Sequence, residues 1–142
     1  MGKVQKMILF VLAVAAIVLV VTTVKLDGQR AHNIEEYALQ NETASDYINS
    51  YCKEVYDGTA LVSEIKKNEV IYTYQYKEPI EERIMNELKS QMGIFGDSME
   101  DAYNRMMKTL LKESGFSKMK VTLRFLDSED DVLYEREYKM KI

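Results

Sequence analysis

The residues with the most direct chemistry are few and stand apart in the sequence. His32 is the only histidine and Cys52 is the only cysteine. We therefore expect no serine–histidine or cysteine–histidine catalysis, no intrachain disulfide and no thiolate zinc cluster. Pairs of carboxylates remain, but they are spread over faces that we expect to be solvated. The sequence predicts no catalytic residue and no bound cofactor.

Four acidic residues, Asp127, Glu129, Asp130 and Asp131, form the best candidate for a cation site. Hard cations such as Ca²⁺ require several oxygen ligands close together, and this run could supply them. It lacks the glycine and the distal glutamate of an EF-hand loop. We interpret the run as a solvated hairpin tip that discourages edge pairing, and we predict no metal site.

A candidate binding surface consists of three tyrosines at every second position and one arginine: Tyr72, Tyr74, Tyr76 and Arg136. Exposed rings in this pattern could bind a glycan or a peptide. Tyrosines at alternate strand positions more often form one side of the hydrophobic core. We favour that interpretation and expect Tyr76 to reach solvent. Arg136 falls on an apolar face opposite Leu123, so it must find a carboxylate or reach an edge. We expect the edge.

Methionines offer a second candidate surface. Five of them lie in one predicted helix and could form an adaptable groove for a partner, although core filling is the commoner use of methionine. They are Met85, Met92, Met99, Met106 and Met107.

The longest apolar run, residues 7–24, contains no charge. As a helix it would measure roughly 27 Å, close to the ~30 Å hydrocarbon core of a bilayer. We predict an uncleaved single-pass signal-anchor, because Ile17 and the apolar residues after it continue beyond the small-residue pattern Ala13-Val14-Ala15. Whether the segment is cleaved stays open. The short basic tail favours the cytoplasm, which places the rest of the chain outside it.

The predicted organisation has four parts: residues 1–6 as a cytoplasmic tail, 7–24 as the membrane anchor, 25–42 as a juxtamembrane spacer, and 43–142 as one extracytoplasmic domain. Three of the 19 basic residues precede Leu26, so the remainder carries 16 basic and 23 acidic residues, a net charge of −7. An acidic domain is a poor partner for nucleic acid and gains nothing from an anionic lipid surface. We expect neither partner for the domain.

The domain is expected to begin with a helix at Thr43, capped with the help of Asp46 and ended by Asp57-Gly58. Residues 60–66 and 69–77 then read as two strands joined by a Lys67-Asn68 turn. This register puts most apolar side chains on one face. The predicted pairs are Ile65 with Val70, Ser63 with Tyr72, and Leu61 with Tyr74.

A long apolar stripe at helical spacing follows from Pro79 to Ser114. Gly93 and Gly96 interrupt it, and we favour one bent helix over two because the stripe keeps its phase. Gly115 suits the left-handed stop. Residues 118–126 and 132–140 then form a second hairpin, whose predicted pairs are Phe125 with Tyr134, Val121 with Tyr138, and Met119 with Met140.

The sequence therefore predicts an α+β protein: an N-terminal transmembrane helix, then a two-layer domain of helix, hairpin, long helix and hairpin. The sheet is expected to have four, mostly antiparallel strands with helices on one face, and the order of the hairpins stays open. The aromatic alternation of Tyr72 to Tyr76, Gly115 and the Tyr134-Glu135 strand resemble a family of small exported or lipid-anchored proteins of clostridia-type Gram-positive bacteria. The proteins of that family share a domain of unknown function. The resemblance covers about Thr43 to Tyr138.

Three functions are compatible with these patterns. The first is a membrane-tethered, non-catalytic binding or accessory module, held in the bilayer by residues 7–24, with a protein or cell-wall partner. The second is a structural protein that forms homo-oligomers through its membrane helix, for which Ala13-Val14-Ala15-Ala16 offers a weak small-residue motif. The third is a hydrolase-like enzyme that uses paired carboxylates, which we disfavour.

Overall fold

The computed structural model describes residues 30–51 and 58–142. The predicted membrane segment and Cys52 lie outside the described residues. The helix that the sequence placed from Thr43 to Asp57 is shorter than expected, because it ends at Asn49 within the described residues. In the two described ranges, no helix has both the length and the apolarity needed to cross a bilayer. The helices are α2 (Ile34–Gln40), α3 (Glu42–Asn49), α4 (Met85–Ser98) and α5 (Glu100–Ser114), with a short 3-10 turn η1 (Glu82–Ile84). The strands are β1 (Thr59–Lys66), β2 (Glu69–Tyr76), β3 (Lys118–Leu126) and β4 (Val132–Lys141).

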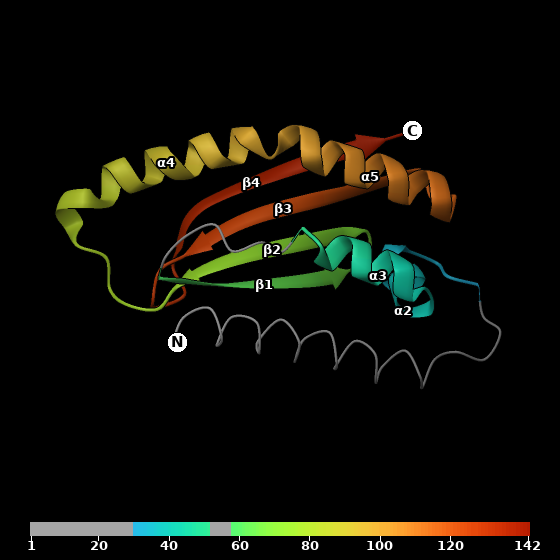
Figure 1. The fold of residues 1–142 in the computed structure, drawn as a ribbon, viewed down its shortest axis with the longest axis horizontal. Helices are drawn as coiled ribbons and strands as arrows, with labels where there is room; N and C mark the ends of the chain where they lie inside the picture. The colour runs from blue at the N-terminus through green and yellow to red at the C-terminus, as the bar shows by residue number, and fades with distance from the viewer. Residues whose placement is uncertain (1–29, 52–57) are drawn as a thin grey trace.

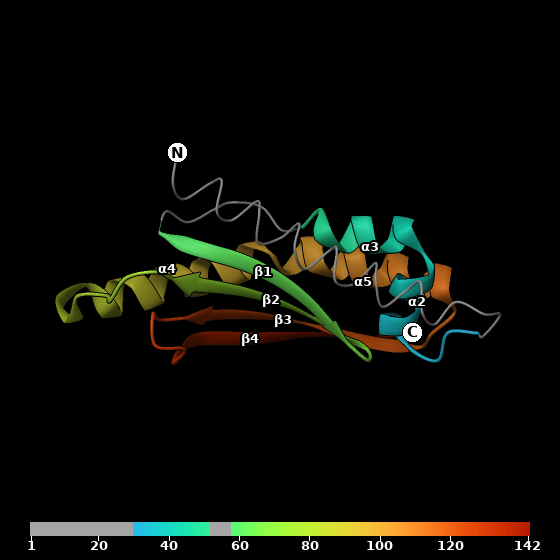
Figure 2. The ribbon, with the colours of Figure 1, turned by 90° about the horizontal axis from the view of Figure 1, so that it is seen from below.

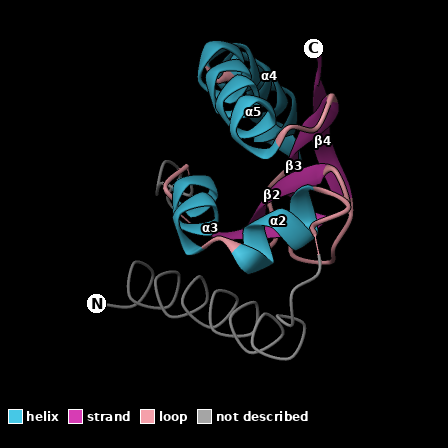
Figure 3. Cartoon of the chain, turned by 90° about the vertical axis from the view of Figure 1, so that its right-hand side faces the viewer, coloured by secondary structure: helices cyan, strands magenta, loops and turns pink. Residues whose placement is uncertain are grey.

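The four strands form one sheet in the order β1-β2-β3-β4 (Figure 1). The two hairpins pair internally as antiparallel strands, whereas β2 and β3 run parallel. A parallel pair needs a long crossover, and η1, α4 and α5 provide it. Figures 2 and 3 show the helices gathered on one face of the sheet. The α+β class is confirmed, and the sheet is mixed because the hairpins meet through their parallel strands.

Both predicted hairpin registers are confirmed. In the first hairpin Ile65 faces Val70 and Leu61 faces Tyr74, and in the second Phe125 faces Tyr134. A shift of one residue would turn every inward side chain to the opposite face, so the apolar pattern leaves one workable register. The Lys67-Asn68 turn also forms, but Lys67 takes the left-handed backbone conformation, with φ 54°.

The long helical stretch bends at Met99, where α4 passes into α5. Met99 keeps a right-handed helical backbone, its N–H donates to Phe95 O at 3.1 Å, and its carbonyl accepts from Tyr103 N at 2.9 Å. The structure therefore has two consecutive helices here, α4 and α5, where the sequence favoured one bent helix. As predicted, Gly115 ends it in the left-handed conformation, with φ 82°.

Gly96 serves the packing of α4 on β4. A Cβ at this position would overlap the Tyr134 hydroxyl and lie 3.1 Å from the ring carbon Cζ. The Tyr138 hydroxyl donates a hydrogen bond to the Gly96 carbonyl. The glycine thus allows two β4 tyrosines to approach the helix backbone closely.

Two N-terminal helices differ from the prediction. The side chains of Ile34 and Ala38 on α2 are buried in the main core, so packing of the described chain begins inside the range that the sequence assigned to a spacer. The N-cap of α3 is Asn41 and not Thr43, because the Asn41 side chain accepts from Ala44 N at 3.3 Å. Several polar residues in succession could serve as a cap, and only the packed structure chooses one.

Aromatic rings join the sheet to the helices. The Tyr72 ring stacks on Tyr103 of α5 at a centroid distance of 5.4 Å, and Tyr74 stacks on Phe125 at 4.8 Å. The tyrosine hydroxyl of Tyr72 donates to Ile48 O at 2.6 Å, so its polar end is satisfied inside the core. Three of the predicted methionines fill the core completely: Met92, Met106 and Met107.

Candidate anion-binding groove

A basic groove lies at the end of the sheet where β1 and β4 finish and where β2 and β3 begin. Its volume is about 840 Å³, and it is open to solvent. Six of its lining residues are lysines: Lys66, Lys67, Lys118, Lys120, Lys139 and Lys141. Glu35, Asn68, Glu69, Met119 and Met140 complete the lining. We refer to this site as the lysine groove.

The strand alternation explains how β3 and β4 supply these cations. Met119 and Val121 turn toward the core and are buried, so Lys118 and Lys120 point to the opposite face. In β4, Lys139 and Lys141 flank the half-buried Met140 in the same way. The antiparallel register then sets Lys118 directly opposite Lys141, and Lys120 directly opposite Lys139.

Two Lys–Lys pairs in succession are an unusual arrangement for neighbouring strands. Like charges directly opposite one another destabilise a sheet, since their Cβ atoms lie only about 5 Å apart. The inner pair is partly relieved, because Lys120 Nζ lies 2.7 Å from Glu137 and 3.6 Å from Glu69. Among the described residues, Lys118 and Lys141 have no ion-pair partner. The outer pair therefore carries two uncompensated charges.

The hydrogen bond between Lys120 and Glu137 also affects their ionisation. The bond from the ammonium group lowers the pKa of Glu137 from its ordinary value, and the same bond raises the pKa of Lys120. Both groups therefore stay charged over the physiological pH range. Within residues 30–51 and 58–142, Lys120 is held by carboxylates, whereas neither Lys118 nor Lys141 is paired with one.

The turn at the groove is fastened to the start of α2. Ile34 N donates to the Asn68 side chain at 3.0 Å, and Glu35 N donates to Lys67 O at 2.8 Å. In return, Lys67 N donates to the Glu35 carboxylate at 3.2 Å. These bonds fix the wall of the groove and place it beside the point where the described chain begins.

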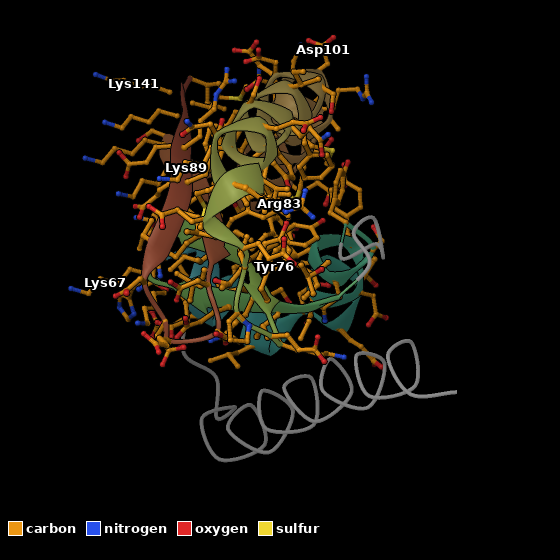
Figure 4. The ribbon with its side chains drawn as sticks, turned by 90° about the vertical axis from the view of Figure 1, so that its left-hand side faces the viewer. Lys67, Tyr76, Arg83, Lys89, Asp101 and Lys141 are labelled. Atoms are coloured by element: carbon orange, nitrogen blue, oxygen red, sulfur yellow. The ribbon has the colours of Figure 1, made fainter. Side chains whose placement is uncertain are left out.

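The two ends of the sheet carry opposite charges, and the lysine groove lies at the positive end. Figure 4 shows Lys67 and Lys141 projecting from the same side of the molecule. The acidic turn between β3 and β4 lies at the opposite end of the strands (Figure 1). It contains Asp127, Glu129, Asp130 and Asp131. β3 has nine residues from Lys118 to Leu126, which places its two ends roughly 27 Å apart.

The tyrosines of the predicted binding surface lie elsewhere. Tyr72 and Tyr74 are 0% and 2% exposed and belong to the core, in line with the interpretation that the sequence favoured. Tyr76 is half-buried and lines a separate hollow with Pro79 and Leu88. The three tyrosines therefore do not form one accessible surface.

Arg136, the fourth predicted site residue, lies on the edge strand β4 as expected and also finds carboxylates. Its guanidinium pairs with Asp97, lies 3.5 Å from Glu100, and sits 4.8 Å from the centroid of the Tyr138 ring. These contacts tie β4 to the junction of α4 and α5. Arg136 is therefore a packing residue here, remote from the lysine groove.

The acidic turn uses its carboxylates for local structure. Asp127 Oδ1 accepts from Glu129 N at 2.8 Å and from Asp131 N at 2.9 Å, which closes the turn. In the part of the chain that the structure describes, no group of three histidine, cysteine or acidic residues is placed to hold a metal ion. His32 is exposed and contacts Glu36 at 3.1 Å, a partner that helical spacing could have suggested.

Sequence reasoning missed the lysine groove, although the sequence contains two usable indications. Lysines flank a methionine in Lys118 to Lys120 and again in Lys139 to Lys141. The predicted pairing of Met119 with Met140 already implied that these lysines face one another. The missing information was the neighbour of β3, because only the parallel pairing with β2 brings Lys66 and Lys67 to the same end.

A family model described as Domain of unknown function (DUF4854) matches residues 34–138. The chain belongs to this family. The match begins with α2 and ends within β4, so it includes the whole aromatic core and four of the six groove lysines. Lys139 and Lys141 follow immediately after the matched range. No curated protein and no solved structure matches the chain.

Proposed function

We propose that the protein is a membrane-tethered, non-catalytic binding module, exposed outside the cytoplasm, that holds an anionic ligand in the lysine groove. The observation that carries this proposal is the opposed pair Lys118 and Lys141, whose charges have no partner among the described residues. A bound anion placed between them would convert a repulsive contact into two attractive ones. The groove thus offers positive charge and a concave surface, and relief of the repulsion between the two lysines would favour binding of an anion.

The membrane tether rests on the sequence. Residues 7–24 have the length and apolarity of a single spanning helix, and the basic residues Lys3 and Lys6 precede it. The resemblance to small exported proteins of Gram-positive bacteria supports the same location. In this arrangement the ligand belongs to the cell envelope.

The absence of catalysis in this proposal rests on what the groove residues already do. Glu35 accepts from Lys67 N, and Glu69 accepts from the Thr122 hydroxyl and faces Lys120. A general acid and base need free carboxyl groups that converge on a substrate. The groove instead presents ammonium groups, which suit recognition of phosphate or carboxylate.

Binding can be tested with the full chain in a nonionic detergent and polyphosphate as the probe. The double variant Lys118→Gln/Lys141→Gln removes both uncompensated charges. Two lost contacts of about 1 kcal/mol each should raise the Kd about 30-fold, and the wild-type Kd should rise with salt. Binding is measured by thermophoresis, with neutral dextran as the negative control.

The matched control is Lys89→Gln/Lys108→Gln, which makes the same change in net charge on exposed positions of α4 and α5. It should bind polyphosphate as the wild type does. Equal loss in both double variants would mean that only overall charge matters. Absence of any binding by the wild type would refute the proposed function.

The tether has its own test in fractionated cells of a Gram-positive host that expresses the chain. The full chain should sediment with membranes, resist extraction by high salt and dissolve in detergent. Protease added to intact protoplasts should degrade the domain. Recovery of the chain in the soluble fraction without detergent would contradict the proposal.

A further inference from the structure

We infer that the lysine groove docks on the anionic headgroups of the same bilayer that residues 7–24 enter, so that the domain lies with its lysine end against the membrane. This inference rests on the proposed function and names its ligand: phosphate groups of anionic lipids. The supporting observations are chain length, charge separation and the composition of the groove.

The first argument is reach. Arg30, where the described chain begins, lies six positions after the end of the predicted span at residue 24, and an extended chain of that length covers roughly 20 Å. Four residues later Ile34 is bonded to Asn68 in the groove wall. The groove is therefore held near the lipid surface at the tethered end of the domain.

The second argument is the separation of charge. The acidic turn lies roughly 27 Å from the lysine end, well beyond the Debye length of about 8 Å at physiological salt. An anionic surface therefore attracts the lysine end without opposing it through the acidic turn. The net charge of −7 on residues 26–142 had suggested no gain from an anionic surface, but that sum averages over positions that the fold separates. Six lysines gather at one end, where Lys66, Lys120 and Lys139 pair with carboxylates and Lys118 and Lys141 have no ion-pair partner among the described residues.

The third argument is the chemistry of the groove. Met140 and the aliphatic stems of the lysines provide apolar surface beneath a rim of ammonium groups. A lipid headgroup presents a phosphate next to glycerol and acyl carbons, so it matches both parts. Phosphate oxygens placed at Lys118 and Lys141 would also remove the repulsion across the β3–β4 pair.

Docking can be measured with tryptophan reporters, because the chain contains no tryptophan. Ile142 and Val132 are exposed aliphatic residues at the lysine end and the acidic end of β4, with 63% and 54% of their surface accessible. The variants Ile142→Trp and Val132→Trp therefore form a matched pair. Each full chain is reconstituted into vesicles that contain phosphatidylcholine with brominated acyl chains, with or without phosphatidylglycerol.

Ile142→Trp should be quenched in vesicles that contain phosphatidylglycerol and should recover in high salt, whereas Val132→Trp should stay bright. Each lysine near an anionic surface is worth about fivefold in the ratio of docked to free domain. Adding Lys118→Gln/Lys141→Gln should therefore lower this ratio about 25-fold, and Lys89→Gln/Lys108→Gln should leave it unchanged.

Three outcomes would overturn the docking inference: equal quenching of Ile142→Trp without phosphatidylglycerol, no quenching in either vesicle, or equal quenching of Val132→Trp. Circular dichroism confirms that each variant is folded. Polyphosphate added to chains in phosphatidylcholine vesicles separates the two proposals. If polyphosphate binds and the lipid does not quench, the docking inference fails while the proposed function stands.

Discussion

The two faces of the sheet use alternate residues of the same strands in opposite ways. On the inner face, Tyr72 stacks on Tyr103, and its hydroxyl finds a carbonyl on α3. On the outer face, Lys118 and Lys141 stand opposite each other without a partner among the described residues. The inner face is satisfied by contacts within the chain, whereas one end of the outer face has two opposed lysines without an ion-pair partner in the described residues. The proposed function uses this difference, because it places stability on the inner face and anion binding on the outer one.

The largest expected effect tests the inner face through Tyr103→Ala. Tyr103 is 1% exposed and contacts both Tyr72 and Tyr138. Removing its ring should lower the free energy of unfolding by about 3 to 4 kcal/mol, because the cavity cannot fill. Urea unfolding of the full chain in nonionic detergent measures this. Arg105→Ala, at an exposed position of α5, is the control, and a comparable loss there would contradict the comparison.

A smaller effect separates two glycines of α4. Gly93→Ala meets no atom within 4 Å and should stabilise the helix by about 1 kcal/mol, whereas Gly96→Ala would displace the Tyr134 ring. Overpacking of this kind costs about 1 to 3 kcal/mol, so the second variant should be less stable than wild type. Thermal unfolding compares the two. Stabilisation by both substitutions would show that the contact of β4 with α4 is loose.

Alkaline pH should weaken the inner face at Tyr138. Burial raises the pKa of Tyr138 to about 12, above the unfolded value of about 10. The unfolded state therefore releases its proton first, so stability is constant below pH ~10 and falls as pH rises from ~10 to ~12. Urea midpoints across this range should fall less steeply in Tyr138→Phe. If the urea midpoint falls equally steeply with pH in both proteins, the loss of stability at alkaline pH belongs to other groups.

The smallest expected effect concerns Lys141 on the outer face, where one substitution should raise stability and weaken binding. Lys141→Glu replaces a repulsive pair with an ion pair across from Lys118, which should stabilise the free protein by about 0.2 to 1 kcal/mol. The same change should weaken polyphosphate binding. Urea unfolding and thermophoresis of one preparation measure both. Loss of stability together with loss of binding would show that Lys141 supports the fold.

Much of the fold could be predicted because its elements depend on local patterns. The pairing of Ile65 with Val70 and of Phe125 with Tyr134 follows from period-two alternation and short turns. The stop at Gly115 follows from its need for a positive φ. A helical turn around Ile34 to Leu39 is compatible with the sequence, but the packing of α2 into the core was missed because a seven-residue helix in polar sequence gives little periodicity.

The candidate site could be predicted only in part. The alternation and the register of the second hairpin were sufficient to oppose Lys118 and Lys141. Lys66 and Lys67 join them through the parallel pairing of β2 with β3, which no local pattern encodes. Net charge could not reveal the lysine groove for the same reason, since it averages over positions that the fold separates.

The sequence by itself determined the two hairpins, the helical stretch between them and which side chains turn inward, because these follow from the periodicity of strands and helices and from glycine conformation. The tertiary structure decided the order of the hairpins, the use of Gly96 as a contact for Tyr134, and the gathering of six lysines at one end. Each of these depends on which distant strands become neighbours, and that choice is made by long-range packing of the core.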